Sequence, residues 1–509
     1  MVHEVVDWSE FLACERGLLI APAGHGKTTT IADCLNLCPD DSCQLVLTHT
    51  HAGIASLKKK LKEKKVPPHK YQLETITGFA QRYVLAFLGA SALPHSEDRD
   101  YFSAAVAKCI DLLNTPVLQY IINVSFDGVF VDEYQDCTIS QHNMILSLAQ
   151  KLPLHILGDP LQGIFDFESE RLVNFDTDLS GLFGFKIFNL LNYPWRWHET
   201  NEELGREIKR IRAALNDQNQ SIQLIPNPKN EIYVEVWENA PDHHSSEYIK
   251  WLSRIIHKYE SNSTLILCPS YFEKNSHGVE IMRGDLNDRI KIKYQIDYTN
   301  SYRVLDAIDG KSYYAVSKSI DQYISRCVKK SRIDPIKHFF NVLSSLYVSR
   351  TFLSKWISKT KKGWAFTDKN KTEDKVLSIL IKNSFKKFIE SPSLNSLLSV
   401  LHTVKSIKGY SNHRPDFCDE ILICAKQAID EGTSLYNAMD KHRSRLRHMG
   451  RKIEGKCIGT TLLTKGLEFD TVILLNADKF EDKKHFYVAI SRACRRLVFI
   501  TQKTVLTFN

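Results

Sequence analysis

Apolar and polar positions follow two different rhythms along the first 200 residues. Four short apolar runs are typical of buried strands: 17–21, 45–49, 128–131 and 154–158. Three longer segments have the spacing of amphipathic helices: 28–35, 52–64 and 139–151. The run at 120–124 is strand-like as well. Strands that alternate with helices predict a parallel sheet with helices on both faces.

The strand pattern returns after residue 230. Strand-like runs occur at 231–236, 263–268 and 496–501, and a further strand pattern lies between 457 and 475. Between about 301 and 451 the chain shows long helical periodicities that carry many lysines. We therefore predict an α/β fold whose second parallel-sheet domain is interrupted by a helical insert.

Composition and charge narrow the class of protein. The 509 residues are 43% hydrophobic and 25% charged, which is typical of a soluble globular protein of several domains. The net charge of +8 has the sign expected for a polyanion partner. The 12 cysteines are scattered, so we interpret them as reduced and mostly buried. No signal peptide or membrane span is expected, and we predict a cytoplasmic protein without a membrane partner.

A phosphate-binding loop is predicted at residues 21–28, which read Ala-Pro-Ala-Gly-His-Gly-Lys-Thr. An apolar run precedes the loop and a helical segment follows it, and a helix N-terminus favours anions. Lys27 would reach the β- and γ-phosphates, and the hydroxyl of Thr28 would bind Mg²⁺. The predicted ATP contacts of this loop are Ala21, Pro22, Ala23, Gly24, His25, Gly26, Lys27, Thr28 and Thr29.

An acidic pair supplies the other half of a nucleotide-hydrolysing site. Asp132 and Glu133 follow the apolar run at 128–131. Asp132 would hold Mg²⁺ together with Thr28, and Glu133 would orient or deprotonate the attacking water. The loop and the acids together predict an enzyme that hydrolyses a nucleoside triphosphate with Mg²⁺.

The motifs resemble, in order, those of the UvrD/Rep-type superfamily 1 DNA helicases. Besides the loop at 21–28, the similar segments are 47–52, 75–80, 132–136, 158–167, 194–197, 464–470 and 487–493. The resemblance implies ATP-driven movement on DNA, in the 3′ to 5′ direction, powered by two RecA-like domains. It also implies that the catalytic site forms when those two domains close on each other.

The resemblance assigns roles to further residues. Gln162, Arg196 and Arg492 would act at the γ-phosphate, Trp195 would stack on the nucleotide base, and Glu468 would lie in the ATP site. The implied DNA contacts are Thr48, His49, Thr77, Phe165, Phe167 and Lys465. The aromatic positions Phe165 and Phe167 would stack on bases, which tolerates any sequence.

The resemblance also implies a division of the chain. Residues 1–80 and 125–200 would form the first RecA-like domain, and 81–124 a short helical insert in it. Residues 201–300 and 452–509 would form the second RecA-like domain, and 301–451 its helical, lysine-rich insert.

Three features of the sequence depart from the family's pattern. No glutamine that would read adenine is found upstream of the loop, so base selectivity is not predicted. Leu462 stands where the family has a histidine in its fifth motif. The segment between Phe79 and Asp127 is short for the family's first insert, so strong unwinding is not assumed.

Three functions remain open from the sequence. The first is a translocase or helicase that acts on single-stranded DNA or on a junction of single and double strands. The second is a DNA-sensing subunit that unwinds weakly and acts with a partner nuclease, as in Gabija-type bacterial anti-phage systems. The chain ends soon after Arg492, so we expect no nuclease domain within it. The third is a phosphate-loop enzyme unrelated to nucleic acid.

Overall fold

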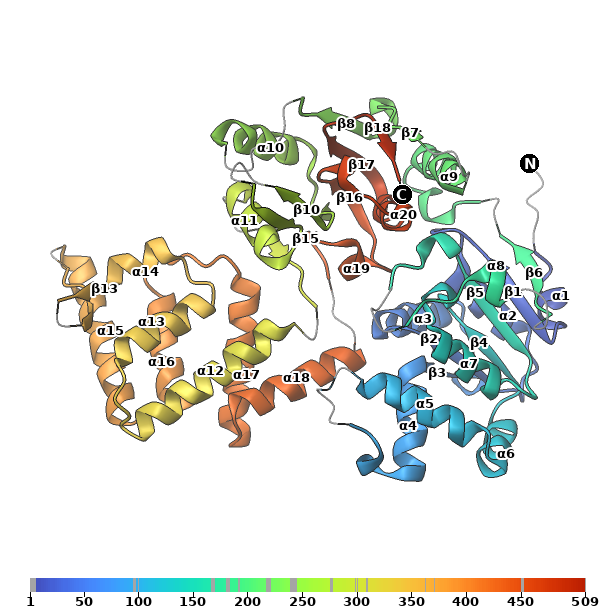
Figure 1. Ribbon diagram of the computed structural model, residues 1–509, viewed down its shortest axis with the longest axis horizontal. Helices are drawn as coiled ribbons and strands as arrows, with labels where there is room; N and C mark the ends of the chain where they lie inside the picture. Colours follow the sequence, from blue (N-terminus) through green and yellow to red (C-terminus); the bar gives the residue numbers. More distant parts are fainter. Residues whose placement is uncertain are drawn as a thin grey trace.

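Three bodies make up the fold of the computed structural model (Figure 1). The structure describes residues 6–94, 98, 100–165, 170–179, 184–190, 193–216, 221–238, 245–274, 278–297, 299, 301–307, 310–361, 363–369, 371–449 and 453–508. Two bodies contain a six-stranded sheet each, and the third is almost entirely helical. All neighbouring strands in both large sheets run parallel, which confirms the predicted α/β class.

The first α/β body contains the sheet of order β3-β2-β4-β5-β1-β6. Its strands are β1 (Arg16–Ile20), β2 (Gln44–Thr48), β3 (Tyr71–Thr75), β4 (Gly128–Val131), β5 (Leu154–Gly158) and β6 (Lys186–Asn189). Its helices are α1 (Trp8–Leu12), α2 (Lys27–Leu37), α3 (His51–Glu63), α4 (Ile76–Leu88), α5 (Tyr101–Leu113), α6 (Pro116–Ser125), α7 (Ile139–Leu148) and α8 (Phe175–Asp178).

Both faces of this first sheet are covered. Side chains on one face join one apolar cluster, which includes Leu18, Leu45, Leu47, Val129 and Ile156. Their chain neighbours join a second cluster on the other face, which includes Leu19, Val46, Phe130 and Leu157. Successive side chains of a strand point to opposite faces, so a continuous apolar run fits a strand buried on both sides.

The strand expected at 120–124 is wrong, because these residues belong to helix α6. Thr115 caps the helix by accepting a hydrogen bond from the Leu118 amide, and Pro116 occupies the first turn. Leu118 and Ile122, four residues apart, are the buried side chains. The cap and this spacing outweigh the strand propensity of the β-branched residues between them.

The second α/β body contains the sheet of order β12-β15-β9-β16-β17-β8. Its strands are β8 (Ile232–Val236), β9 (Thr264–Leu267), β12 (Tyr302–Val304), β15 (Lys456–Gly459), β16 (Phe469–Leu474) and β17 (Ala493–Thr501). Two antiparallel pairs accompany it: β7 (Ser221–Gln223) with β18 (Val505–Thr507), and β10 (Tyr271–Lys274) with β11 (Glu280–Arg283). Its helices are α9 (Glu202–Asn216), α10 (Ser246–Tyr259), α11 (Leu286–Ile296), α19 (Thr461–Thr464) and α20 (Lys483–Ile490).

The helical body is inserted between two adjacent strands of the second sheet, β12 and β15. Its helices are α12 (Lys311–Val328), α13 (Pro335–Ser345), α14 (Arg350–Trp356), α15 (Thr372–Glu390), α16 (Leu394–Lys405), α17 (Pro415–Glu431) and α18 (Leu435–Met449). It also holds a hairpin of β13 (Ile357–Thr360) and β14 (Gly363–Phe366). It has its own apolar cluster, and α18 extends from it toward the first body, where it contacts α3 (Figure 1).

The cysteines agree with the expectation that they are reduced and mostly buried. All twelve cysteines are free thiols. Burial raises the thiol pKa so far that no thiolate forms near neutral pH at seven of them: Cys34, Cys109, Cys137, Cys268, Cys418, Cys424 and Cys494. Within the described ranges, no helix combines the length and the apolar character that crossing a bilayer requires.

The helical body offers a direct test of its packing. Phe388 is fully buried, with its ring centroid 5.4 Å from that of Tyr323, whereas the next residue, Ile389, is 38% exposed. Phe388→Ala should lower the free energy of unfolding by about 3–5 kcal/mol, because it removes a large side chain and leaves a cavity. Ile389→Ala on the same helix should cost less than about 1 kcal/mol. Urea unfolding followed by circular dichroism measures both, and equal losses would contradict the packing described here.

Candidate functional site

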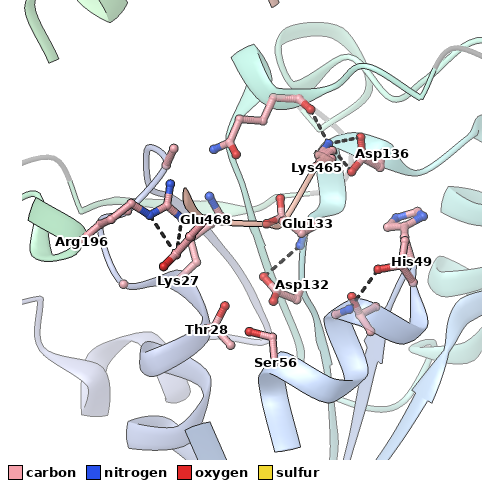
Figure 2. A pocket seen from close by; sticks show the side chains of 18 of the residues that line it. Lys27, Thr28, His49, Ser56, Asp132, Glu133, Asp136, Arg196, Lys465 and Glu468 are labelled. Atoms are coloured by element: carbon pink, nitrogen blue, oxygen red, sulfur yellow. Dashed lines mark hydrogen bonds and ion pairs between the residues drawn. The ribbon is translucent and has the colours of Figure 1, made fainter. Parts of the chain in front are cut away.

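A cavity of about 340 Å³ lies where the two α/β bodies meet (Figure 2). Residues that follow strands β1, β2, β4 and β5 form one side of it, and residues of the segment 194–197 and of the second body form the other. Ligands of parallel α/β sheets bind beyond the carboxyl ends of the strands, so the cavity has the position expected of a binding site.

Most of the residues singled out in the sequence line this one cavity. From the first side they are Pro22, Ala23, Gly24, Gly26, Lys27, Thr28, Thr29, Thr48, His49, Asp132, Glu133, Gln162 and Phe165. The remaining ones are Trp195, Arg196, Lys465, Glu468 and Arg492. Side chains for which the resemblance implied ATP contacts and side chains for which it implied DNA contacts therefore share one continuous space.

Four of the singled-out residues lie elsewhere or cannot be placed. Ala21 is buried behind the loop, and its carbonyl accepts a hydrogen bond from Lys27 Nζ at 2.9 Å. His25 is also buried, with Nδ1 2.9 Å from the Ala23 carbonyl. Thr77 is half-buried in the first turn of α4, and Phe167 lies outside the described residues.

The loop has the backbone that a phosphate cradle needs. Gly26 has a φ of 94° and is the N-cap of α2, which starts at Lys27. As a glycine, it has no side chain that could accept a hydrogen bond from the first amides of the helix. A residue with a Cβ is strained at such a φ, so glycine is favoured here. The first-turn amides of α2 thus face the cavity without a side chain to satisfy them, which suits an anion.

The acidic pair is buried at the end of β4. Burial raises the pKa of Asp132, and the neighbouring Glu133 carboxylate raises it further. Burial also raises the pKa of Glu133, but Lys27 and Lys465 outweigh it and hold that pKa below its usual value. Glu133 has a φ of 56°, a conformation that costs free energy for a residue with a Cβ and is common at functional sites.

Two arginines bring positive charge from the side of the second body. Arg196 pairs with Glu468 at 2.8 Å and donates to the Ser491 carbonyl at 2.5 Å, and its charge lowers the pKa of Glu468. Arg492 is 2% exposed and donates to the carbonyls of Val488 and Leu467. Burial, followed by the charge of Arg196, lowers the pKa of Arg492 to about 10, so it is still a cation at neutral pH.

Lys465 crosses the cavity to the first body. Its ammonium pairs with Asp136 and donates to the carbonyl of Gln162 (Figure 2). It also lies 5.0 Å from the ring centroid of Phe165. Burial raises the pKa of Asp136 to about 6, although Lys465 opposes that rise. Lys465 is thus held between the acidic segment and the segment that carries Gln162.

His49 stands beside this lysine as a neutral ring. Burial, followed by the charge of Lys465, lowers the pKa of the His49 ring to about 3. Its Nε2 lies 3.3 Å from the thiol of Cys137.

Two tryptophans that are close in the chain have different environments. Trp195 is 56% exposed at the rim of the cavity, and a Cβ added to Gly26 would lie 3.5 Å from its ring. Trp197 is fully buried, and its Nε1 donates to the Ala493 carbonyl at 2.6 Å. Trp195 is therefore open to a ligand, whereas Trp197 joins the segment at 194–197 to the second body.

The structure adds lining residues that the motifs did not single out as site residues. They are Thr50, Gly53, Ser56, Lys60, Asp136 and Gly466. Ser56 and Lys60 lie one helical turn apart on α3, and this spacing on a basic helix after the 47–52 motif is the signal that could have found them.

Gly24 supplies a test of the loop. Its φ is 73°, and an added Cβ would lie 2.8 Å from Arg196 Cβ and from the Trp197 ring. Gly24→Ala should therefore push the loop away from Arg196 and Trp197. If the loop binds nucleotide as its sequence predicts, affinity for a fluorescent ATP analogue should fall at least about tenfold.

A matched control is available at Gly432, the C-cap of α17. Its φ is 64°, and nothing lies within 4 Å of an added Cβ. Gly432→Ala carries similar backbone strain without a collision, so its nucleotide affinity should equal that of the unaltered protein. Tight nucleotide binding by the Gly24→Ala protein would rule out the loop as the phosphate cradle.

Comparisons with known proteins find matches to parts of the chain. Residues 95–179 match the family described as "UvrD/REP helicase N-terminal domain". A curated relative, an ATP-dependent helicase/nuclease subunit of Alkaliphilus metalliredigens (strain QYMF), is 26% identical over 180 residues. This match covers 32% of the chain and 14% of the relative, so the chain spans only a small part of that protein's length.

A solved structure, the Escherichia coli DEAH/RHA helicase HrpB, is 13% identical and covers 58% of this chain and 29% of its own. The TM-score of this similarity is 0.29. The region that matches the family contains the strands β4 and β5, and it also contains Asp132, Glu133 and Gln162, which line the cavity. Residues 95–179 of the chain are therefore similar to the UvrD/REP helicase N-terminal domain.

Proposed function

We propose that the protein is an ATP-dependent translocase or helicase that moves on single-stranded DNA. The observation that carries this proposal is that one cavity joins the phosphate-binding loop, the acidic pair and two arginines from the side of the second α/β body. Such a site changes its chemistry when the two bodies move, and this couples hydrolysis to motion.

Charge stabilisation is the main task of the site, because phosphoryl transfer needs little covalent chemistry from the protein. Lys27, Arg196 and Arg492 would surround the phosphoryl oxygens with positive charge. Glu133 would orient the attacking water, and Gln162 would respond to the γ-phosphate. Trp195, exposed at the rim, would stack on the base, and Glu468 would hold Arg196 in place.

Mg²⁺ fits the donor set of this cavity. Thr28 and Asp132 both line it, and the Thr28 hydroxyl interacts with the Asp132 carboxylate. Mg²⁺ commonly takes one or two protein oxygens and completes its shell with phosphates and water, so two adjacent ligands suffice. The ion would neutralise developing charge on the phosphates.

The proposed DNA contacts are Thr48, His49, Thr77, Phe165, Phe167 and Lys465. A neutral His49 and an aromatic Phe165 suit stacking against bases, which gives affinity without sequence preference. By family resemblance the direction of movement would be 3′ to 5′. The substrate would be single-stranded DNA or a junction of single and double strands.

A second candidate function is favoured by one surface feature. Val117, Tyr120 and Val124 are 61%, 69% and 64% exposed on one face of α6. An exposed apolar face is typical of a protein interface. It would suit a DNA-sensing subunit that unwinds weakly alone and acts with a partner nuclease in bacterial anti-phage defence. The curated relative is itself named as a helicase/nuclease subunit.

The first test is ATP hydrolysis with and without single-stranded DNA. We expect DNA to stimulate the rate, and Lys27→Ala and Glu133→Gln each to lower kcat at least about 100-fold, because each removes a group that acts on the phosphoryl transfer. Lys186→Ala is the control. Lys186 lies on the edge strand β6, where it pairs with Glu10 of α1, and neither residue lines the cavity. Hydrolysis that does not respond to DNA or RNA would rule out a nucleic-acid motor.

Unwinding separates the two candidate functions. Partial duplexes with a 3′ or a 5′ single-stranded tail report both strength and direction. Fast strand separation from a 3′ tail supports the stand-alone helicase. Strong DNA-stimulated hydrolysis with little strand separation supports the alternative in which the protein needs a partner nuclease.

A further inference from the structure

Arg212 lies outside every motif noted in the sequence, yet its side chain pairs with a buried residue of the first body. It belongs to α9, which packs on β17 and α20 of the second body. Its side chain is 13% exposed, and its Nη2 donates to Asp159 Oδ1 at 2.8 Å. Asp159 is fully buried directly after β5 of the first body. The pair therefore joins the two α/β bodies behind the cavity.

Asp159 uses both carboxylate oxygens to fix the segment that carries Gln162. Its Oδ1 also accepts from the Leu161 amide at 3.2 Å, and its Oδ2 accepts from Gln162 Nε2 at 2.9 Å. The side chain of Gln162 thus has its amide group set by a carboxylate whose charge is balanced by Arg212. An unbalanced buried carboxylate is costly, so without Arg212 this segment would rearrange.

The same node reaches the acidic pair. The Asp159 amide donates to Gln135 Oε1 at 2.9 Å, and Gln135 Nε2 donates to Glu133. Arg212 also lies 5.9 Å from the ring centroid of Tyr487, whose hydroxyl accepts from the Ala23 amide of the loop at 3.1 Å. One cation of the second body is therefore linked to Gln162, to Glu133 and to the phosphate-binding loop.

We propose that Arg212 is a positioning residue for nucleotide hydrolysis. By balancing Asp159 it holds Gln162 and Gln135 in place, and it does so only while the two α/β bodies are closed. The response to the γ-phosphate thereby depends on closure. This inference rests on the proposed ATPase, but it concerns a residue that no motif assigns.

The test compares Arg212→Met with Arg212→Lys and Asp159→Asn. In Arg212→Met we expect kcat of DNA-stimulated hydrolysis to fall at least about tenfold while KM for ATP changes less than about threefold, because the substrate still binds the loop. Arg212→Lys keeps the charge and should recover part of the loss. Because the two residues act as a unit, the double variant Arg212→Met/Asp159→Asn should be no worse than the poorer single variant.

Discrimination between nucleotides provides a readout that a merely structural role would not move. Affinities for fluorescent ATPγS and ADP are measured with Mg²⁺ for each variant. In Arg212→Met the preference for the triphosphate should shrink at least about threefold, since Gln162 is no longer held at the γ-phosphate. Arg210→Met is the control, because Arg210 lies on the same helix and pairs with Glu207 at the surface. It should change none of these values more than about twofold.

The inference is overturned if Arg212→Met keeps the kcat and the triphosphate preference of the unaltered protein. It is also overturned if affinity for both nucleotides falls equally and Arg212→Lys recovers nothing. Should Arg212→Met fail to fold, the triphosphate preference of Arg212→Lys and Asp159→Asn decides: a reduced preference supports the inference and an unchanged one overturns it. An unaltered protein that does not hydrolyse ATP defeats the proposed function instead, and the binding comparison still tests Arg212.

Discussion

Ion pairs that cross from one α/β body to the other hold the cavity together. Lys465 reaches Asp136, and Arg212 reaches Asp159, and in both cases the carboxylate is almost completely buried. An unpaired charge at these depths would be costly, so each pair requires the two bodies to be close. When the bodies part, water can hydrate both charged groups, and this hydration offsets much of the free energy lost with the ion pair. A polar interface of this kind opens more easily than an apolar core, as repeated closure requires.

Cations that line the cavity already have polar partners within the protein. Lys27 donates to a loop carbonyl, Arg196 is paired with Glu468, and Lys465 is paired with Asp136. An incoming polyphosphate would therefore exchange partners rather than meet free cations. This pairing keeps the closed arrangement stable, and it makes each cation's position sensitive to what the others bind. Because Asp136 and Gln162 share Lys465, a change at one segment is passed to the other.

Where the signal is local, the sequence predicted most strands of the two sheets, and most of the residues that it singled out line one cavity. Runs of four to six apolar residues indicated the buried strands, and the loop and the acidic pair are short motifs whose geometry follows from neighbouring residues. Short edge strands such as β3 and β12 were missed, because an edge strand carries a weaker apolar pattern. Residues 120–124 were misassigned because a cap at Thr115 decided the helix. Arg212 could not be found, since its role depends on contacts between distant parts of the chain.

The helical body is tied to the same movement by its place in the chain. It leaves the second sheet after β12 and returns at β15, two adjacent strands, so it is fixed to that sheet at neighbouring points. Its last helix, α18, contacts α3 of the first body (Figure 1). Gly53, Ser56 and Lys60 of that same α3 line the cavity. A relative rotation of the two α/β bodies must therefore either break the contact between α18 and α3 or displace one of these helices. As long as that contact is kept, the position of the helical body and the shape of the cavity change together.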